Sequence, residues 1–244
     1  NYHADLVASS LYSVVHEGGH ALYELHVGRE LSRTCLGGGV SMAIHESQSR
    51  FYENIIGRSR AFCGVIYPWL REHFAPRLDD VSQDAFYRMI NKAQPSLIRT
   101  EADELTYCLH IMVRYELERR MFAGELTAHD LPAEWNRLYK AYLGVDVPND
   151  REGVLQDSHW AGGSIGYFPS YAIGSLRQMQ KDFDVFEAVR SGRLTRINGW
   201  LEDKIWKYGC MKDPTPLFES VCGPFDPTCY TAYLRDKFTE VYGL

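Results

Sequence analysis

Long apolar runs and basic residues are both scarce in this sequence of 244 residues. A membrane-spanning helix needs about 20 consecutive apolar residues, and no stretch of the chain approaches that length. Lys and Arg together number 26 against 32 Asp and Glu, which gives a net charge of −6. Because binding to nucleic-acid phosphates needs a basic surface, the sequence predicts neither a membrane nor a nucleic acid as the main partner.

Paired cysteines are also missing. None of the six cysteines stands in a C-x-x-C pair, so neither a zinc ribbon nor a thioredoxin-like redox site is indicated. Irregular spacing and apolar surroundings such as AFCGVIY are typical of reduced, buried thiols, and we therefore expect a cytoplasmic protein. Cys210, Cys222 and Cys229 would allow a disulfide only in an oxidising compartment.

Apolar spacing and capping residues along the chain predict an all-α fold, and the absence of internal repeats, low-complexity segments and Pro/Ser-rich linkers favours one domain over residues 1–244. Apolar residues recur at helical spacing from 4 to 27 and predict a long first helix. A second helix is expected from 43 to 57. The segment between them contains three consecutive glycines at 37–39, which disfavour helix and allow a loop or a short pair of strands.

Capping residues predict several later helices. Thr100 followed by Asp103 resembles a capping box and predicts that a helix starts there. Other helices are expected where a capping residue or proline precedes an amphipathic stretch: after Ser82, between Pro132 and Gly144, and between Pro227 and Gly243.

The sequence HEGGH places His16 and His20 four residues apart on a predicted helix. Residues at this spacing share one face of a helix. In H-E-x-x-H sites the two imidazoles bind zinc, and the glutamate takes a proton from the water on the metal. The pattern therefore predicts His16 and His20 as metal ligands and Glu17 as the catalytic base. The alternative is an exposed helix without a metal, in which the same five-residue motif occurs by chance.

A catalytic zinc site needs a third protein ligand and one open position. Glu46 stands on the next predicted helix, after a connection long enough for that helix to fold back antiparallel. His16, His20 and Glu46 together give the two-histidine, one-glutamate set of zinc peptidases, which also accepts cobalt or manganese. His45 is adjacent to Glu46 but points elsewhere on a helix, and we expect it to have a structural role.

Gly18 and Gly19 each weaken the first predicted helix by about 1 kcal/mol relative to alanine. Gly19 lies roughly 60° from His16 around the helix, so a side chain there is expected to crowd Glu46 or the substrate. Gly18 is expected on the back of the helix, where the missing Cβ would let another helix come close. The two glycines therefore predict close packing around the metal site.

Five motifs follow one another along the chain: HEGGHALYE, HESQSRFYEN, IRTEAD, GVLQDSHW and GYFPSYAIG. In this order they resemble the M32 family of metallocarboxypeptidases, the carboxypeptidase Taq group, and the likeness extends over essentially the whole chain. Members of that family are about twice as long, and this chain is similar to their C-terminal half. Because it begins at Asn1 rather than at a methionine, we expect a piece of a longer protein, without the family's D-x-R-x-T motif.

The resemblance implies an all-α, zincin-type half with a short loop or β segment between the two helices that carry the metal ligands. It implies a Zn²⁺ ion held by His16, His20 and Glu46, with Glu17 as the catalytic carboxylate. It also implies a long groove, commonly a homodimer, and release of C-terminal amino acids from peptide substrates with broad specificity.

A carboxypeptidase must recognise a free carboxylate, and arginine can do so through two parallel hydrogen bonds. With the resemblance, Arg99 of IRTEAD is the candidate; without it, a solvated arginine at a helix start would be favoured. Negative charge also develops on the scissile carbonyl oxygen and requires hydrogen-bond donors. The resemblance points to His159, Tyr167 and Tyr171 for this purpose, with Tyr171 slightly favoured.

Two other functions fit part of the sequence. A non-catalytic, zinc-binding helical fragment or assembly module would keep the same ligands and would also begin abruptly. A metal-storage or redox protein would need more soft or carboxylate ligands than this site offers. We therefore expect metal-assisted hydrolysis of peptides, with the assembly module as the alternative.

Overall fold

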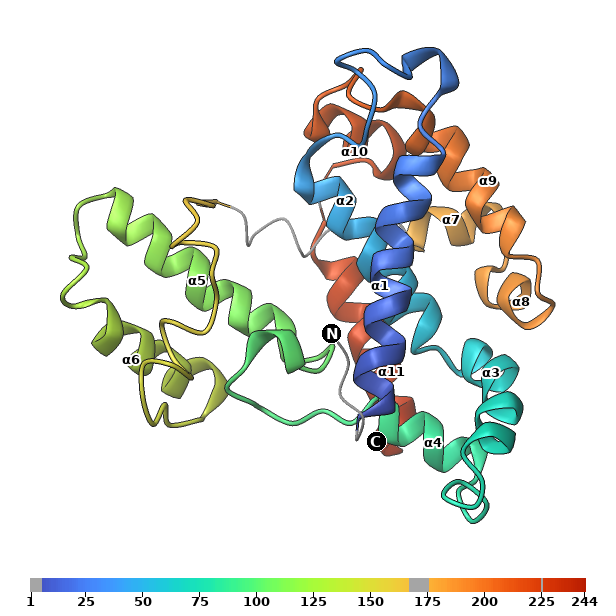
Figure 1. The fold of residues 1–244 in the computed structure, drawn as a ribbon, viewed down its shortest axis with the longest axis horizontal. Helices are drawn as coiled ribbons and strands as arrows, with labels where there is room; N and C mark the ends of the chain where they lie inside the picture. Colours follow the sequence, from blue (N-terminus) through green and yellow to red (C-terminus); the bar gives the residue numbers. More distant parts are fainter. Residues whose placement is uncertain (1–5, 167–175, 225) are drawn as a thin grey trace. The chain divides into compact units, whose positions relative to one another are not determined.

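The computed structural model describes residues 6–166, 176–224 and 226–244. The chain divides into two compact units, one formed by Asn1–Asn91 with Ile173–Leu244 and the other by Lys92–Ala172. Within the described residues all regular structure is helical (Figure 1), which confirms the predicted all-α fold. The single domain over residues 1–244 stays a prediction.

The first unit contains most of the helices, and α1 is the long helix drawn in dark blue in Figure 1. Its elements are α1 (Val7–Leu25), η1 (Arg29–Leu31), α2 (Ser41–Arg50), η2 (Phe51–Gly57), α3 (Arg60–His73), α4 (Gln83–Ile90), α7 (Leu176–Asp182), α8 (Val185–Arg190), α9 (Leu194–Lys204), η5 (Trp206–Tyr208), α10 (Pro214–Cys222) and α11 (Thr228–Tyr242). The second unit contains η3 (Arg99–Glu101), α5 (Tyr107–Phe122) and α6 (Leu131–Leu143).

Local sequence signals set several helix ends. The Ser82 hydroxyl accepts a hydrogen bond from the backbone N–H of Ala85 and caps α4. Pro132 stands in the first turn of α6, and Gly144 ends that helix with φ of 72°. Gly243 ends α11 with φ of 70°. Glycine adopts this left-handed conformation without steric cost, and the predicted positions of these ends are confirmed.

The predicted start of α5 is wrong. The chain forms the 3-10 helix η3 at the expected capping box, and the α-helix starts only at Tyr107. Asp103 instead accepts hydrogen bonds from the backbone N–H groups of Leu105 and Thr106, at 2.9 and 3.0 Å. An aspartate side chain competes for backbone donors in this way, and the resulting turn delays the helix.

The connection between α1 and α2 consists of η1 and turns, so the loop alternative is confirmed and no strand pair forms in residues 26–40. α2 starts at Ser41, close to the predicted position. Beyond Arg50 the chain continues as the π-helix η2 to the predicted end at Gly57. π-helical turns are rare and often accompany functional sites. Because α1 packs against both α2 and η2, the histidines lie beside the helix that carries Glu46.

Each unit has its own apolar core. In the first unit, Tyr23 of α1, Ile44 of α2 and Trp206 of η5 are buried in one cluster. In the second unit, Trp135 of α6 packs with Leu117 of α5. The elements that hold the histidines are therefore anchored by burial within the first unit.

All six cysteines have free thiols. The expectation that these thiols are buried holds for Cys63 but is wrong for Cys35, which is exposed, and the other four are partly buried. None of the described helices is both long enough and apolar enough to cross a membrane.

Candidate metal centre

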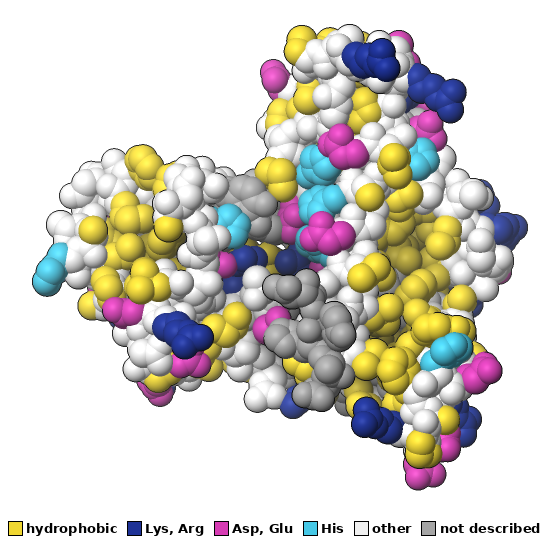
Figure 2. Space-filling model, viewed as in Figure 1, with side chains coloured by type: hydrophobic (Ala, Val, Ile, Leu, Met, Phe, Trp, Pro, Cys, Tyr) yellow, Lys and Arg dark blue, Asp and Glu magenta, His cyan; other side chains and the backbone are white. Residues whose placement is uncertain are grey.

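Helices α1 and α2 bring the three predicted ligands together. The Nε2 atom of His16 lies 3.4 Å from Oε1 of Glu46, and Nε2 of His20 lies 3.0 Å from Oε2 of Glu46. One ligand atom from each of the three residues falls within 4.8 Å of the other two. In Figure 2, histidine and acidic side chains gather over α1 and α2 on the face toward the viewer. The three side chains therefore converge on one point.

Gly19 allows α2 to approach α1 this closely. A Cβ atom on Gly19 would lie 2.6 Å from Cα of Ser49 and 2.8 Å from the carbonyl oxygen of Gln48. These are backbone atoms of the helix that carries Glu46, so a side chain at Gly19 would push that helix away. The crowding expected at Gly19 is therefore confirmed.

The prediction for Gly18 is wrong. A Cβ atom on Gly18 would meet no described atom within 4 Å. The physical reason is that α2 packs against the side of α1 on which His16, Gly19 and His20 lie, so the close helix–helix contact falls on Gly19 and not on its neighbour.

His16 is held from behind by Glu53 of η2. Nδ1 of His16 lies 2.9 Å from Oε2 of Glu53, and Nη1 of Arg50 donates to the same oxygen at 3.0 Å. Burial by itself would raise the pKa of Glu53, but the His16 hydrogen bond and the charges of Arg50 and Arg58 outweigh burial and lower it. An ionised Glu53 accepts the Nδ1 proton of His16, which leaves the Nε2 lone pair directed at the shared point.

Sequence reasoning missed Glu53, although a signal was present. Glu46, Arg50 and Glu53 are spaced by four and then three residues, so they share one face of a continuous helix. That spacing predicts that a second carboxylate follows Glu46 on the side facing α1.

His20 is held by His45, the residue for which a structural role was predicted. Nδ1 of His20 lies 3.0 Å from Nδ1 of His45, and Nε2 of His45 lies 2.6 Å from Oε1 of Glu24. Glu24 was also missed, although His16, His20 and Glu24 follow one another at intervals of four on α1. Burial would raise the pKa of Glu24, but the Gly39 N–H and His45 lower it overall.

Glu46 and Glu17 have opposite environments. Glu46 is 3% exposed; burial would raise its pKa, but the hydrogen bond to His20 and the charges of His16 and Arg50 lower it. The carboxylate is therefore ionised and ready to bind a cation. Glu17 is exposed and is not one of the three converging groups, which suits a base that acts on water rather than a ligand.

The donor set fits a divalent transition metal. Two imidazole nitrogens and one carboxylate oxygen are typical ligands of catalytic zinc, with a fourth position open to water or substrate. Hydrogen bonds at both Nδ1 atoms leave both Nε2 atoms free to bind. The three residues therefore fit the predicted ion, and their role as its ligands is taken up as a proposal below.

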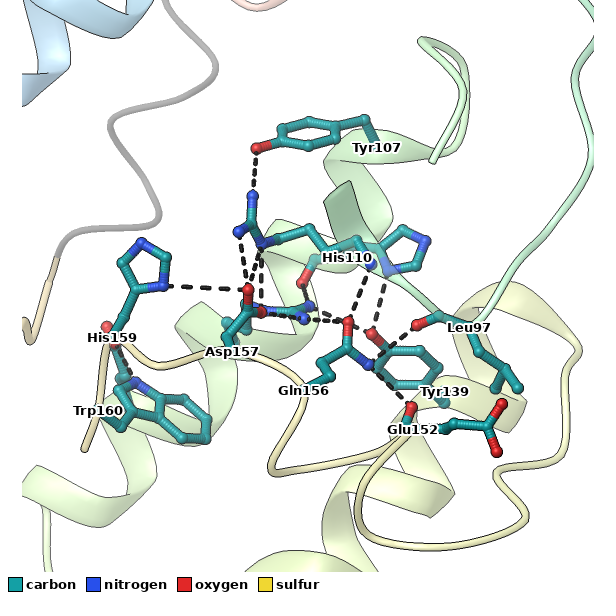
Figure 3. A network of polar contacts seen from close by, with 12 residues as sticks. Leu97, Tyr107, His110, Tyr139, Glu152, Gln156, Asp157, His159 and Trp160 are labelled. Carbon is teal, nitrogen blue, oxygen red and sulfur yellow. Dashed lines mark hydrogen bonds and ion pairs between the residues drawn. The ribbon is translucent and has the colours of Figure 1, made fainter. Parts of the chain in front are cut away.

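Arg99 lies in the second unit and is buried. It contacts Asp157, which lies within the network of polar contacts shown in Figure 3. Its Nη2 donates to Oδ1 of Asp157 at 2.7 Å, and its Nη1 donates to the hydroxyl of Tyr107 at 3.0 Å. Arg114, which is 0% exposed, donates from Nε to the other Asp157 oxygen at 2.7 Å. The guanidinium of Arg99 is therefore engaged by protein groups, and its contact with a substrate carboxylate stays a prediction.

Asp157 is the centre of this network. Burial by itself would raise the pKa of Asp157, but the hydrogen bonds from Arg99 and the charge of Arg114 outweigh burial and lower it. Gln156 joins the same two arginines, because its Oε1 accepts from the backbone N–H of Arg99 and from Nη2 of Arg114, both at 2.9 Å. The IRTEAD and GVLQDSHW motifs are thus tied to each other and to α5.

His159 lies at the edge of the network, with Nδ1 3.9 Å from Oδ1 of Asp157 (Figure 3). Its neighbour Trp160 is fixed by a 2.6 Å hydrogen bond from Nε1 to Glu118 of α5. Contact of His159 with the reacting carbonyl stays a prediction. The other two predicted donors, Tyr167 and Tyr171, lie outside the described residues.

Comparisons with known proteins identify sequences and structures that this chain resembles. The sequence pattern of the carboxypeptidase Taq (M32) metallopeptidase family matches residues 1–238. The chain is 43% identical to carboxypeptidase 1 of Bacillus subtilis over 242 residues, which cover 96% of this chain and 48% of that protein. It is 43% identical to thermostable carboxypeptidase 1 of Pyrococcus furiosus over 237 residues, covering 94% of this chain and 47% of the relative.

A solved structure shares the fold. The crystal structure of an M32 carboxypeptidase from Deinococcus radiodurans superposes with a TM-score of 0.91 at 41% identity, covering 96% of this chain and 49% of that one. The chain thus spans about half the length of the relatives it matches. With the family pattern matched over nearly all its residues, this chain belongs to the carboxypeptidase Taq (M32) metallopeptidase family.

Proposed function

We propose that this chain carries the catalytic centre of a zinc-dependent metallocarboxypeptidase that releases C-terminal amino acids from peptides. The convergence of His16, His20 and Glu46 within 4.8 Å is the observation that supports it most strongly. Membership of a metallopeptidase family and relatives named as carboxypeptidases support the reaction class. A homodimer in the cytoplasm remains part of the proposal, as the resemblance and the thiol pattern predict.

In this proposal, His16 and His20 bind the ion through Nε2 and Glu46 binds it through its carboxylate. A zinc ion supplies Lewis acidity and lowers the pKa of a water that it holds. Glu17 accepts a proton from the attacking water and then donates it to the leaving amine. The lowered pKa values of Glu53 and Glu46 favour their ionised forms.

Recognition of the substrate's C-terminal carboxylate is assigned to Arg99, as the resemblance predicts. Such a role requires one of its donors to turn from Tyr107 or Asp157 toward the substrate. His159, Tyr167 and Tyr171 are kept as candidate donors to the oxyanion. These assignments depend on the resemblance.

Metal analysis tests the ligand set. We expect one zinc per chain in the wild-type protein, and loss of zinc in both His20→Ala and Glu46→Ala. Unchanged zinc content in the two variants would contradict the assignment. Cobalt- and manganese-loaded protein, assayed in parallel, identifies the metal that supports hydrolysis.

Hydrolysis of an N-acetylated peptide, followed by mass spectrometry with and without chelator, tests the reaction. In the complete enzyme we expect stepwise, chelator-sensitive loss of C-terminal residues, and a drop of at least 10²-fold in Glu17→Gln with zinc retained, the usual scale for a lost general base. The 244 residues alone are expected to bind zinc but to cleave peptides poorly. Internal cleavage would overturn the carboxypeptidase assignment. Zinc binding without any hydrolysis would favour the assembly module.

A further inference from the structure

His45 links a ligand histidine to a carboxylate. Its Nδ1 lies 3.0 Å from Nδ1 of His20, and its Nε2 lies 2.6 Å from Oε1 of Glu24. The side chain of His45 is 13% exposed, whereas that of Glu24 is 49% exposed. The chain of contacts thus runs from the surface of α1, through α2, and back to His20 on α1.

Only one arrangement of protons satisfies both contacts when His20 binds a cation through Nε2. That nitrogen must offer its lone pair, so the His20 proton sits on Nδ1 and is donated to His45. Nδ1 of His45 must then be the acceptor, and a neutral His45 carries its proton on Nε2. The Glu24 carboxylate accepts a hydrogen bond from this N–H, so each of the two contacts joins one donor to one acceptor.

The ring of His45 is also locked in place by packing. The Tyr23 ring lies against it, with centroids 4.8 Å apart. A Cβ atom on Gly39 would lie 2.5 Å from Nε2 of His45, so the backbone at Gly39 closes another side of the ring. The backbone N–H of Gly39 donates to Glu24 at 2.8 Å, which fixes the carboxylate against the same loop. A side chain held from several sides is suited to orient another one.

We propose that His45 and Glu24 are positioning residues that set the tautomer and the ring orientation of His20 for metal binding. This inference rests on the proposed function, because it requires His20 to be a ligand. Partners that hold the outer nitrogen of a ligating histidine commonly change metal affinity by 10–100-fold. His45 therefore acts through His20 and does not touch the metal or the substrate itself.

Zinc affinity, measured by competition with a chromophoric chelator, tests the proposal. Leu and Asn have nearly the same shape, but only Asn offers an oxygen near the position of the histidine Nδ1. We expect His45→Leu to bind Zn²⁺ about 10–100-fold more weakly than wild type, and His45→Asn to recover part of that loss. Glu24→Gln should weaken binding in the same direction, while Glu202→Gln, on an exposed position of α9, serves as the control and should leave it unchanged.

Two further measurements separate positioning from general structural support. Urea unfolding of the metal-free proteins should show a much smaller difference between His45→Leu and His45→Asn than their zinc affinities show. Long-range ¹H–¹⁵N correlation spectra of the zinc-loaded wild type should show His20 protonated on Nδ1 and His45 protonated on Nε2. A His45 protonated on Nδ1, or wild-type zinc affinity in His45→Leu, would overturn the proposal.

The variant His20→Ala distinguishes an error in the proposed ligand set from an error in the positioning role of His45 and Glu24. If it binds zinc as tightly as wild type, the ligand set of the proposed function is wrong. If it loses zinc while His45→Leu and Glu24→Gln do not, the ligand set stands and only the positioning role is refuted.

Discussion

A single methyl group on Gly19 tests how the two ligand helices pack. In Gly19→Ala the new Cβ would lie 2.6 Å from Cα of Ser49, whereas ordinary contacts begin at 3.4 Å. The distance from the new Cβ to Cα of Ser49 is thus about 0.8 Å shorter than an ordinary contact. Because Cα is a backbone atom, it cannot rotate away as a side chain can. Either α2 moves away from α1, or the helices deform where Glu46 is presented to His16 and His20.

The neighbouring glycine provides a matched control. Gly18→Ala adds the same methyl group one residue earlier in the same helix, with no described atom within 4 Å of the new Cβ. Helix propensity alone should stabilise either variant by about 1 kcal/mol. Overpacking typically costs about 1–3 kcal/mol, so Gly19→Ala should be less stable than Gly18→Ala by about that amount, with the propensity gain cancelling between them.

Urea unfolding of the metal-free proteins measures this difference, and zinc competition shows whether the ligands still converge. We expect Gly18→Ala to unfold at higher urea than wild type with unchanged zinc affinity. Gly19→Ala should unfold at lower urea than Gly18→Ala and bind zinc more weakly. Equal stability of the two variants, or equal zinc affinity, would refute the packing argument.

Three further predictions concern the buried network of the second unit. Burial and the charges of Arg114 and Arg99 lower the pKa of His110 from 6.5 to about 3. Below pH 6.5 the unfolded chain therefore binds a proton that the folded chain does not, and the free energy of unfolding of the wild type should fall toward pH 4 by up to about 1.4 kcal/mol per pH unit from this group. In His110→Gln, the free energy of unfolding measured with urea should depend less steeply on pH. Asp157 has a lowered pKa, so its contribution is present above the ordinary pKa of aspartate and is lost as the pH falls through the lower folded value; Asp157→Asn, which leaves two buried arginines without their carboxylate, should cost about 3–5 kcal/mol in the free energy of unfolding at pH 7. Arg99→Lys removes the two-pronged contact with Asp157 and should lower the unfolding midpoint in the absence of substrate; an unchanged midpoint with a raised KM would instead support direct contact with the substrate.

The residues proposed as metal ligands, His16, His20 and Glu46, could be selected from sequence because their signals are local. The i, i+4 spacing of the histidines depends only on helix geometry, and the next carboxylate follows on the next helix. Caps at Ser82, Gly144 and Gly243 were equally local, and the structure has them where they were predicted.

Other features could not be predicted because they depend on which side of α1 meets α2. Two adjacent glycines look alike in sequence, yet only Gly19 lies against a neighbouring backbone. The partners of the ligand histidines, Glu53 and His45, come from residues 37 and 25 positions further along the chain. The prediction of where α5 starts failed for a different reason, because Asp103 uses its side chain in a turn rather than in a capping box.

The sequence alone determined the helical class, the residues proposed to bind a metal and the family to which the chain is similar, because helical periodicity and motif spacing are properties of nearby residues in the chain. Only the tertiary structure decided how those residues are supported. The approach of α2 to Gly19, the hydrogen bonds behind both histidines and the enclosure of Arg99 by Asp157 each join segments distant in sequence. Such contacts depend on distances between packed backbones, which no local pattern specifies.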